Sequence, residues 1–137
     1  MAIELDRSVI GREFDHTVLQ PITAEEILEH IAITGETEPP TSNEDLVAPP
    51  TFVAHIRGQR FMPLSLASIR SGFDAGKDIE FGVPIRPGDV LTSASTVHDI
   101  YEKTGRSGTM SFAVLRTVVT NQRGEQVAVI DQRMMFR

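Results

Sequence analysis

The sequence has no cysteine among its 137 residues, which excludes disulfides, thiolate nucleophiles and cysteine-ligated metals. Its apolar runs are only a few residues long, too short to span a membrane. The start of the chain lacks a basic stretch followed by an apolar one, so we expect no signal peptide and a cytoplasmic location. Positive charge is also scarce. The formal net charge of −6 argues against nucleic acid as the main partner, since binding nucleic acid depends on neutralising phosphates.

What the sequence does contain is typical of one soluble domain. Hydrophobic residues make up 40% and charged residues 23%, which are ordinary values for a globular protein. A chain of this length can bury enough surface to fold without disulfides, and it leaves little room for a second domain. We therefore expect a single domain over residues 1–137.

One segment has the full pattern of an amphipathic helix. Thr23 is followed three places later by Glu26, the signature of a capping box, and Gly35 offers a stop. The spacing predicts a helix over 24–34 with an apolar face made by Ala24, Ile27, Leu28 and Ile31.

A long loop and a second apolar segment follow. Residues 35–50 contain four prolines and many short polar side chains, and loops of this length are either functional or disordered. Pro50 suits the first turn of a helix, where its missing N–H costs nothing. We expect a second, apolar helix from Pro50 to Arg60 or Phe61, ending before Pro63.

Most of the remaining sequence alternates as strands do. The patterns predict five strands, at Glu13–Leu19, Asp78–Ile85, Val90–Tyr101, Thr109–Thr120 and Glu125–Phe136. Short connections make the last three antiparallel neighbours. The predicted architecture is α+β, with a long antiparallel sheet wrapped around a central apolar helix. Because the 109–120 strand is apolar on both faces, one face needs the second helix and the other needs either another subunit or the loop and first helix; we expect a dimer.

This plan resembles a known family. Val47–Phe52 opens the second helix, Pro84–Leu91 surrounds a Pro-Gly turn, and Tyr101–Gly108 precedes an apolar strand. Together they are similar to the N-terminal type of MaoC-like dehydratase domain, which has the hot-dog fold, and the similarity runs from Gly11 to Phe136. The resemblance implies hydration of enoyl thioesters, or dehydration of 3-hydroxyacyl thioesters, carried on coenzyme A or acyl carrier protein, with no further cofactor. Many members work as two hot-dog halves of which one holds the catalytic dyad.

The family's catalytic motif is degenerate here. Active members have, directly after a Gly, an Asp, any residue, Asn, Pro, an apolar residue and His; the Asp and His share a water. After Gly35, this sequence has Glu36 at the Asp position, Glu38 at the Asn position and Thr41 at the His position; Pro39 matches. A threonine cannot carry the proton of an imidazole near neutral pH. We therefore expect the dyad to be absent from this chain.

The resemblance also implies a carbonyl-binding helix end. If a helix begins at Pro50, the first free backbone donors are those of Thr51 and Phe52, which suit a thioester oxygen. The alternative is that these donors meet water or the side chains of Asp45 and Asn43. We expect substrate contacts at Ala48, Thr51, Phe52 and Arg86. Arg86 belongs to the densest basic stretch and would favour the phosphates of a carrier, although solvated surface charge is the alternative.

The four histidines give weaker indications. His55 follows Thr51 by about one turn and is a candidate replacement base, or else a histidine hydrogen-bonded at the sheet or subunit interface. His30 follows Glu26 by four residues and predicts a local pair only. No histidine has a metal-ligand spacing, so we expect no metal.

Three hypotheses for function follow. The first is a hydratase/dehydratase subunit of fatty acid metabolism that lacks its own dyad and acts as a dimer beside a competent hot-dog partner. The second is a stand-alone hydratase or thioesterase with rearranged catalysis through Glu36, Glu38 or His55. The third is a non-enzymatic protein that binds acyl thioesters.

Overall fold

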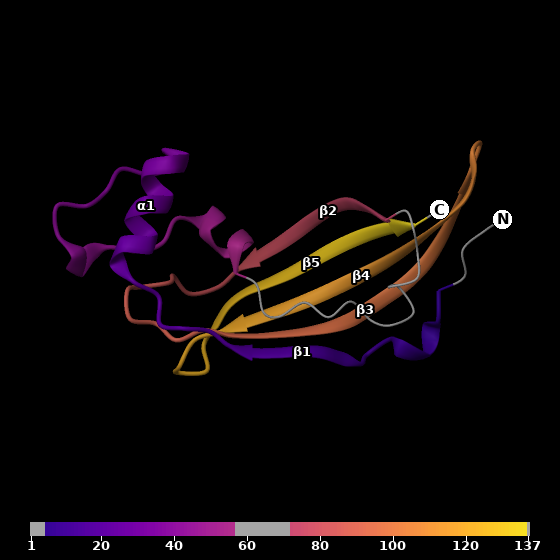
Figure 1. Cartoon of the computed structure of the whole chain (residues 1–137), viewed down its shortest axis with the longest axis horizontal. Coiled ribbons are helices and arrows are strands. Elements are labelled where there is room, and N and C mark those ends of the chain that lie inside the picture. Colours follow the sequence, from indigo (N-terminus) through magenta and orange to yellow (C-terminus); the bar gives the residue numbers. More distant parts are fainter. Residues whose placement is uncertain (1–4, 57–71, 137) are drawn as a thin grey trace.

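The computed structural model of the chain describes residues 5–56 and 72–136, with the side chain of His55 excepted. One antiparallel sheet dominates it, with strands in the order β1-β3-β4-β5-β2 (Figure 1). The strands are β1 (Glu13–Val18), β2 (Gly72–Phe81), β3 (Thr92–Gly105), β4 (Gly108–Thr120) and β5 (Gln126–Phe136). Among the described residues, α1 (Ala24–Thr34) is an α-helix, and η1 (Arg7–Val9), η2 (Asn43–Asp45) and η3 (Pro50–His55) are short 3-10 helices. The predicted α+β class and the antiparallel order of the last three strands are confirmed.

Helix α1 has the bounds that its sequence predicts. The Thr23 hydroxyl accepts a hydrogen bond from the Glu26 N–H, and the Glu26 carboxylate accepts one from the Thr23 N–H, both at 3.1 Å. At the other end, Gly35 adopts the left-handed conformation with φ of 63°, and its N–H donates to the Ile31 carbonyl. Both ends of this helix are therefore fixed by local contacts.

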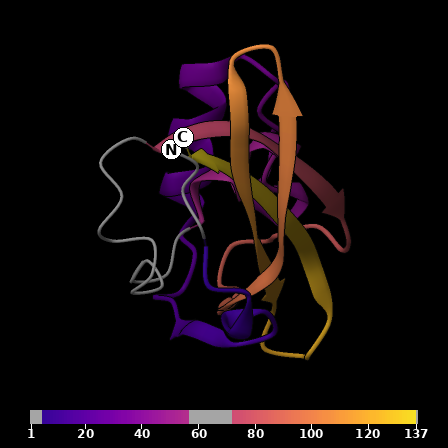
Figure 2. The same ribbon diagram turned by 90° about the vertical axis from the view of Figure 1, so that its right-hand side faces the viewer.

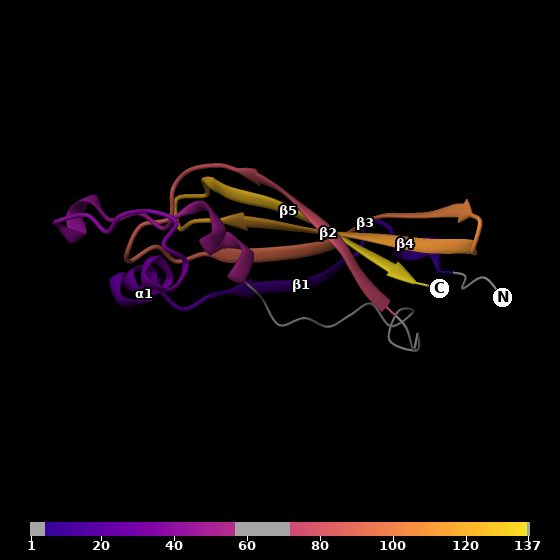
Figure 3. The same cartoon turned by 90° about the horizontal axis from the view of Figure 1, so that it is seen from above.

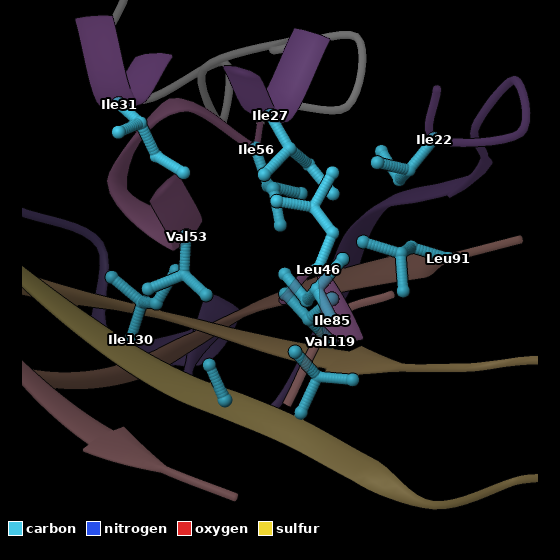
Figure 4. Packing of buried hydrophobic residues seen from close by; sticks show 12 residues of the cluster. Ile22, Ile27, Ile31, Leu46, Val53, Ile56, Ile85, Leu91, Val119 and Ile130 are labelled. Atoms are coloured by element: carbon cyan, nitrogen blue, oxygen red, sulfur yellow. The ribbon is translucent and has the colours of Figure 1, made fainter. Parts of the chain in front are cut away.

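Helices α1 and η3 pack on the same face of the sheet, at the end where β4 turns into β5 (Figures 1 and 3). Ile27 and Ile31 point from α1 toward Val53 and Ile56, and these four meet the strands at Ile130 and other apolar residues (Figure 4). The opposite end of this face has its own cluster, covered by the N-terminal segment and made of Leu5, Val97, Ile100, Ala113, Leu115 and Phe136. On β4, the face that carries Ser111, Ala113, Leu115 and Val119 is the buried one.

Two predicted strands differ from the structure. The strand expected at Asp78–Ile85 is β2, which begins at Gly72 and ends at Phe81. Its start contains a bulge, where Gly76 has φ of 111° and the register with β5 shifts, so its sequence does not alternate. The strand expected at Val90–Tyr101 continues to Gly105. It pairs with β4 throughout the hairpin that projects from the sheet in Figure 2. The sequence ended the strand early because its last part includes exposed charged residues, Glu102 and Lys103, which are typical of a turn.

The predicted second helix is also different. The segment from Pro50 to His55 is a 3-10 helix of six residues, and Ile56 is already extended with ψ of 115°. Its N-cap residue, Pro49, makes no side-chain capping bond. Runs of 3-10 helix are short because their hydrogen-bond geometry is poorer than that of an α-helix. The rest of the prediction, to Arg60 or Phe61, lies outside the described residues.

The outer face of the sheet carries an ion pair that makes stability depend on pH. Both Arg116 nitrogens Nε and Nη2 lie 2.8 Å from the Asp131 carboxylate. Hydrogen bonding from Arg116 lowers the pKa of the Asp131 carboxyl. The pair therefore stabilises the fold above the pKa of an unfolded Asp, about 3.9, and this stabilisation is lost as the pH falls through the lower, folded value.

Replacing Arg116 by Gln is expected to lower the free energy of unfolding by about 0.5–1 kcal/mol at neutral pH, because the pair is partly exposed. The difference from the wild type should shrink as the pH falls below about 4. Urea unfolding of both proteins from neutral to strongly acidic pH measures this. A difference that stays constant over that range would contradict the assignment.

Candidate functional site

The turn at 86–89 anchors the elements around the candidate site. Gly88 donates to the Ile22 carbonyl at 2.7 Å, and the Ile22 N–H donates to the Asp89 carbonyl at 2.9 Å, which ties the start of α1 to the turn. The Asp89 side chain is only 4% exposed and accepts hydrogen bonds from the Arg86 N–H and from Gln122. The Pro-Gly turn predicted from the sequence thus sets where the chain enters α1.

Glu36, at the position of the family's catalytic Asp, contacts the start of η3. Its carboxylate accepts the Thr51 N–H at 3.4 Å and also a short hydrogen bond from the Thr51 hydroxyl. Both hydrogen-bond donors of Thr51 are directed at one carboxylate. Glu36 therefore caps η3, which has no side-chain cap of its own.

His30 reaches the same hydroxyl. Its Nε2 lies 2.8 Å from Thr51 Oγ1, and its ring meets the Phe52 ring edge-on, with centroids 5.4 Å apart. Because the single hydroxyl proton of Thr51 goes to Glu36, Nε2 of His30 is the donor in this contact. The sequence suggested a local pair of His30 with Glu26 and did not predict its contact with Thr51. His30 lies on the side of α1 that faces η3, but no local pattern indicates which residue it meets.

The other predicted site residues do not join this group. Glu38 and Thr41 are exposed in the loop after α1, and Arg86 is exposed in the turn. His55 ends η3, and its side chain lies outside the described residues. Among Glu36, Glu38, Pro39 and Thr41, Glu36 contacts another element within the described parts of the chain, namely η3 through Thr51.

The backbone donors expected to be free are used within the chain. The Thr51 N–H donates to Glu36, and the Phe52 N–H donates to the Pro49 carbonyl at 2.9 Å. The Ala48 N–H donates to the Ile85 carbonyl at 2.8 Å. The expectation of unoccupied donors at Thr51 and Phe52 is therefore wrong, because a carboxylate 15 residues earlier and the 3-10 turn itself satisfy them.

Two hollows lie on either side of η3. A groove of about 540 Å³ between α1 and η3 is lined by Ile22, His30, Ile33, Phe52 and Ile56, among others. A more apolar pocket of about 280 Å³ lies between η3 and the segment after β2, and its walls include Ala48, Pro50, Val53, Phe81, Gly82 and Ile85. The volume of the groove falls within the range of small-molecule sites, and that of the pocket lies just below it.

Within the described parts of the chain, no three His, Cys, Asp or Glu side chains are grouped so as to hold a metal ion. No helix there is long and apolar enough to cross a membrane. The arrangement therefore offers hydrogen-bonding and apolar contacts for a ligand, from residues on α1, η3 and the turn after β2.

The family model for the FAS1-like dehydratase domain region matches residues 8–130. The chain belongs to this family. Its fold is the hot-dog fold of the MaoC-like dehydratases, as the Pro50 and Pro84–Leu91 segments suggested. The chain belongs to the family although the catalytic motif after its Gly35 is not intact.

Individual relatives are distant. UPF0336 protein SCO4636 of Streptomyces coelicolor is 27% identical, over 97% of this chain and 95% of that protein. A chain of the ChsH1–ChsH2 complex from Mycobacterium tuberculosis has a TM-score of 0.71 at 15% identity, over 91% of this chain and 88% of that one. A chain of the HadBC (3R-hydroxyacyl-ACP dehydratase) complex from the same organism has a TM-score of 0.60 at 21% identity, over 90% and 92%. These likenesses establish the fold.

Proposed function

We propose that this chain is a subunit of an enoyl-thioester hydratase/3-hydroxyacyl-thioester dehydratase, paired with a hot-dog partner that supplies an intact Asp and His dyad. The chain would shape the acyl site and stabilise the complex. Membership of a dehydratase family supports the reaction class. The relatives ChsH1–ChsH2 and HadBC are themselves complexes, which supports a paired assembly.

The contact between Glu36 and Thr51 carries this proposal. Hydration needs a carboxylate and an imidazole that share one water, with one group taking a proton while the other delivers one. Here the carboxylate at the Asp position already accepts both donors of Thr51, and a threonine stands at the His position. In this proposal, a chain with this arrangement binds and positions the acyl thioester, and its partner carries out the proton transfer.

The acyl group would lie against η3. Ala48, just before η3, borders the apolar pocket, whereas Phe52, within η3, borders the groove, and Thr51 lies between them in the chain. Arg86 follows Ile85, a wall residue of the pocket, and its charge would favour the phosphates of coenzyme A or of a carrier protein's prosthetic group. No other cofactor enters this proposal.

The test is hydration of crotonyl-CoA by the purified chain, alone and after co-purification with a hot-dog protein from the same cell that has the intact motif. We expect hydration by the pair to exceed that of the chain alone by at least about 100-fold, the low end of what general acid–base catalysis contributes. Size-exclusion chromatography with light scattering reports whether the two form one complex. Robust hydration by the isolated chain would refute the pairing.

A stand-alone enzyme with rearranged catalysis is the second candidate, and the contact between His30 and Thr51 favours it, because it brings an imidazole within one hydroxyl of Glu36. It ranks second because the Glu36 carboxylate already accepts both donors of Thr51 and a threonine stands at the His position. Unchanged activity of the isolated chain after Glu36→Gln and His30→Gln would remove it. Saturable acyl-CoA binding with no turnover in any mixture would instead favour a non-enzymatic binding protein.

A further inference from the structure

Helix η3 separates the two hollows of the candidate site. Phe52 and Ile56 face the groove beside α1, whereas Pro50 and Val53 face the apolar pocket beside the segment after β2. A shift of this six-residue helix would enlarge one hollow and narrow the other. The position of η3 therefore sets the shape of both.

Contacts from outside η3 hold it in place. A 3-10 helix this short has little stability of its own, and Pro49 gives it no side-chain cap. Thr51 instead donates its N–H and its hydroxyl to Glu36 and accepts from His30, while Phe52 packs against the His30 ring. We call these three residues, His30, Glu36 and Thr51, the clasp.

The end of α1 directs two of the clasp residues toward η3. The left-handed turn at Gly35 places Glu36 immediately beyond the helix. The Thr34 hydroxyl accepts the Glu36 N–H at 3.3 Å and donates to the His30 carbonyl at 2.9 Å, so one side chain supports both. Hydrogen bonds that involve a charged partner are about twice as strong as neutral ones, so Glu36 is expected to contribute most to the clasp.

We propose that Glu36, at the family's catalytic position, is here a positioning residue that fixes η3 through Thr51 and His30 and so determines which acyl groups the chain accepts. The inference rests on the proposed function for its ligand. His30 and Thr51 then contribute to selectivity among acyl groups, and none of the three clasp residues transfers a proton.

The experiment compares binding of short-, medium- and long-chain saturated acyl-CoA to the full chain by titration calorimetry. Glu36→Gln and Thr51→Val should each weaken the best ligand by about two- to fivefold, the loss expected for one charged hydrogen bond at an exposed position, and should flatten the chain-length preference. Thr51→Ser keeps the hydroxyl and should restore both. The double variant should be no weaker than the weaker single variant, because both changes remove the same contact.

Glu44→Gln is the matched control, since it makes the same change at an exposed carboxylate of η2, away from both hollows. Amide hydrogen exchange at Thr51 and Phe52 should accelerate in Glu36→Gln and stay unchanged in Glu44→Gln. Equal behaviour of these two variants in binding and exchange would overturn the clasp. An affinity loss with an unchanged chain-length preference would reduce it to a structural contact and overturn its role in selectivity.

Failure of the proposed function is distinguishable from failure of the clasp. If the wild-type chain binds none of the acyl-CoA probes, alone or paired, the proposed function and the role in selectivity are refuted together. The exchange rates at Thr51 and Phe52 then decide separately whether Glu36 holds η3.

Discussion

Replacing Gly82 by Ala is expected to cost more than about 3 kcal/mol of stability, which places it at the upper end of overpacking effects. A Cβ atom at this position would lie 1.9 Å from the Gln126 carbonyl oxygen and 2.8 Å from its carbon. The obstacle is backbone, so no rotamer change relieves it. The Gly82 N–H also donates to the Val127 carbonyl at 2.8 Å, and moving the strands apart would break this bond. Urea unfolding measures the loss.

Gly105→Ala is the matched control for this prediction. A Cβ atom there would meet nothing within 4 Å, and its φ is outside the left-handed region. This variant should be neutral or more stable by up to about 1 kcal/mol, because alanine restricts the unfolded chain. Because Gly82 also borders the apolar pocket, the proposed function predicts that its variant binds acyl-CoA more weakly than Gly105→Ala does. A Gly82→Ala protein as stable as Gly105→Ala would show that β2 and β5 do not approach this closely.

Replacing Ile27 by Ala is expected to destabilise the protein by about 3 kcal/mol, through lost apolar burial and the cavity left behind. Its side chain is fully buried, 0% exposed, where α1 meets η3 and the sheet (Figure 4). For a domain of this size the loss corresponds to a decrease in melting temperature of roughly 10 °C. Thermal unfolding followed by circular dichroism measures it.

The same helix provides the control. Ile33 is 77% exposed, so Ile33→Ala makes the same chemical change at an exposed position of α1 and should alter stability by less than about 0.5 kcal/mol. Equal effects of the two substitutions would mean that α1 does not pack through Ile27. The comparison also separates packing from helix propensity, since alanine favours the helix at both positions.

The sequence by itself determined the helix ends and turns, because these depend on residues only a few positions apart in the chain. The bounds of α1 follow from the capping box at Thr23 and the stop at Gly35, and both are confirmed. The turns before Asp89 and after Asn121 follow from their glycines, Gly88 with φ of 89° and Gly124 with φ of 74°. The degenerate motif at Glu36, Glu38 and Thr41 can also be read directly, because the family's motif has a fixed spacing.

Only the tertiary structure decided what depends on contacts across the chain. The early start of β2 is set by pairing of Gly72 with Phe136, which no local alternation reveals. The clasp joins Thr51 to Glu36, 15 positions earlier in the chain, and to His30, 21 positions earlier. The residues between them carry no periodic signal that would predict these contacts. Whether a carboxylate holds a catalytic water or caps a helix depends on which donors the fold brings to it, and here the fold brings both donors of Thr51 to Glu36.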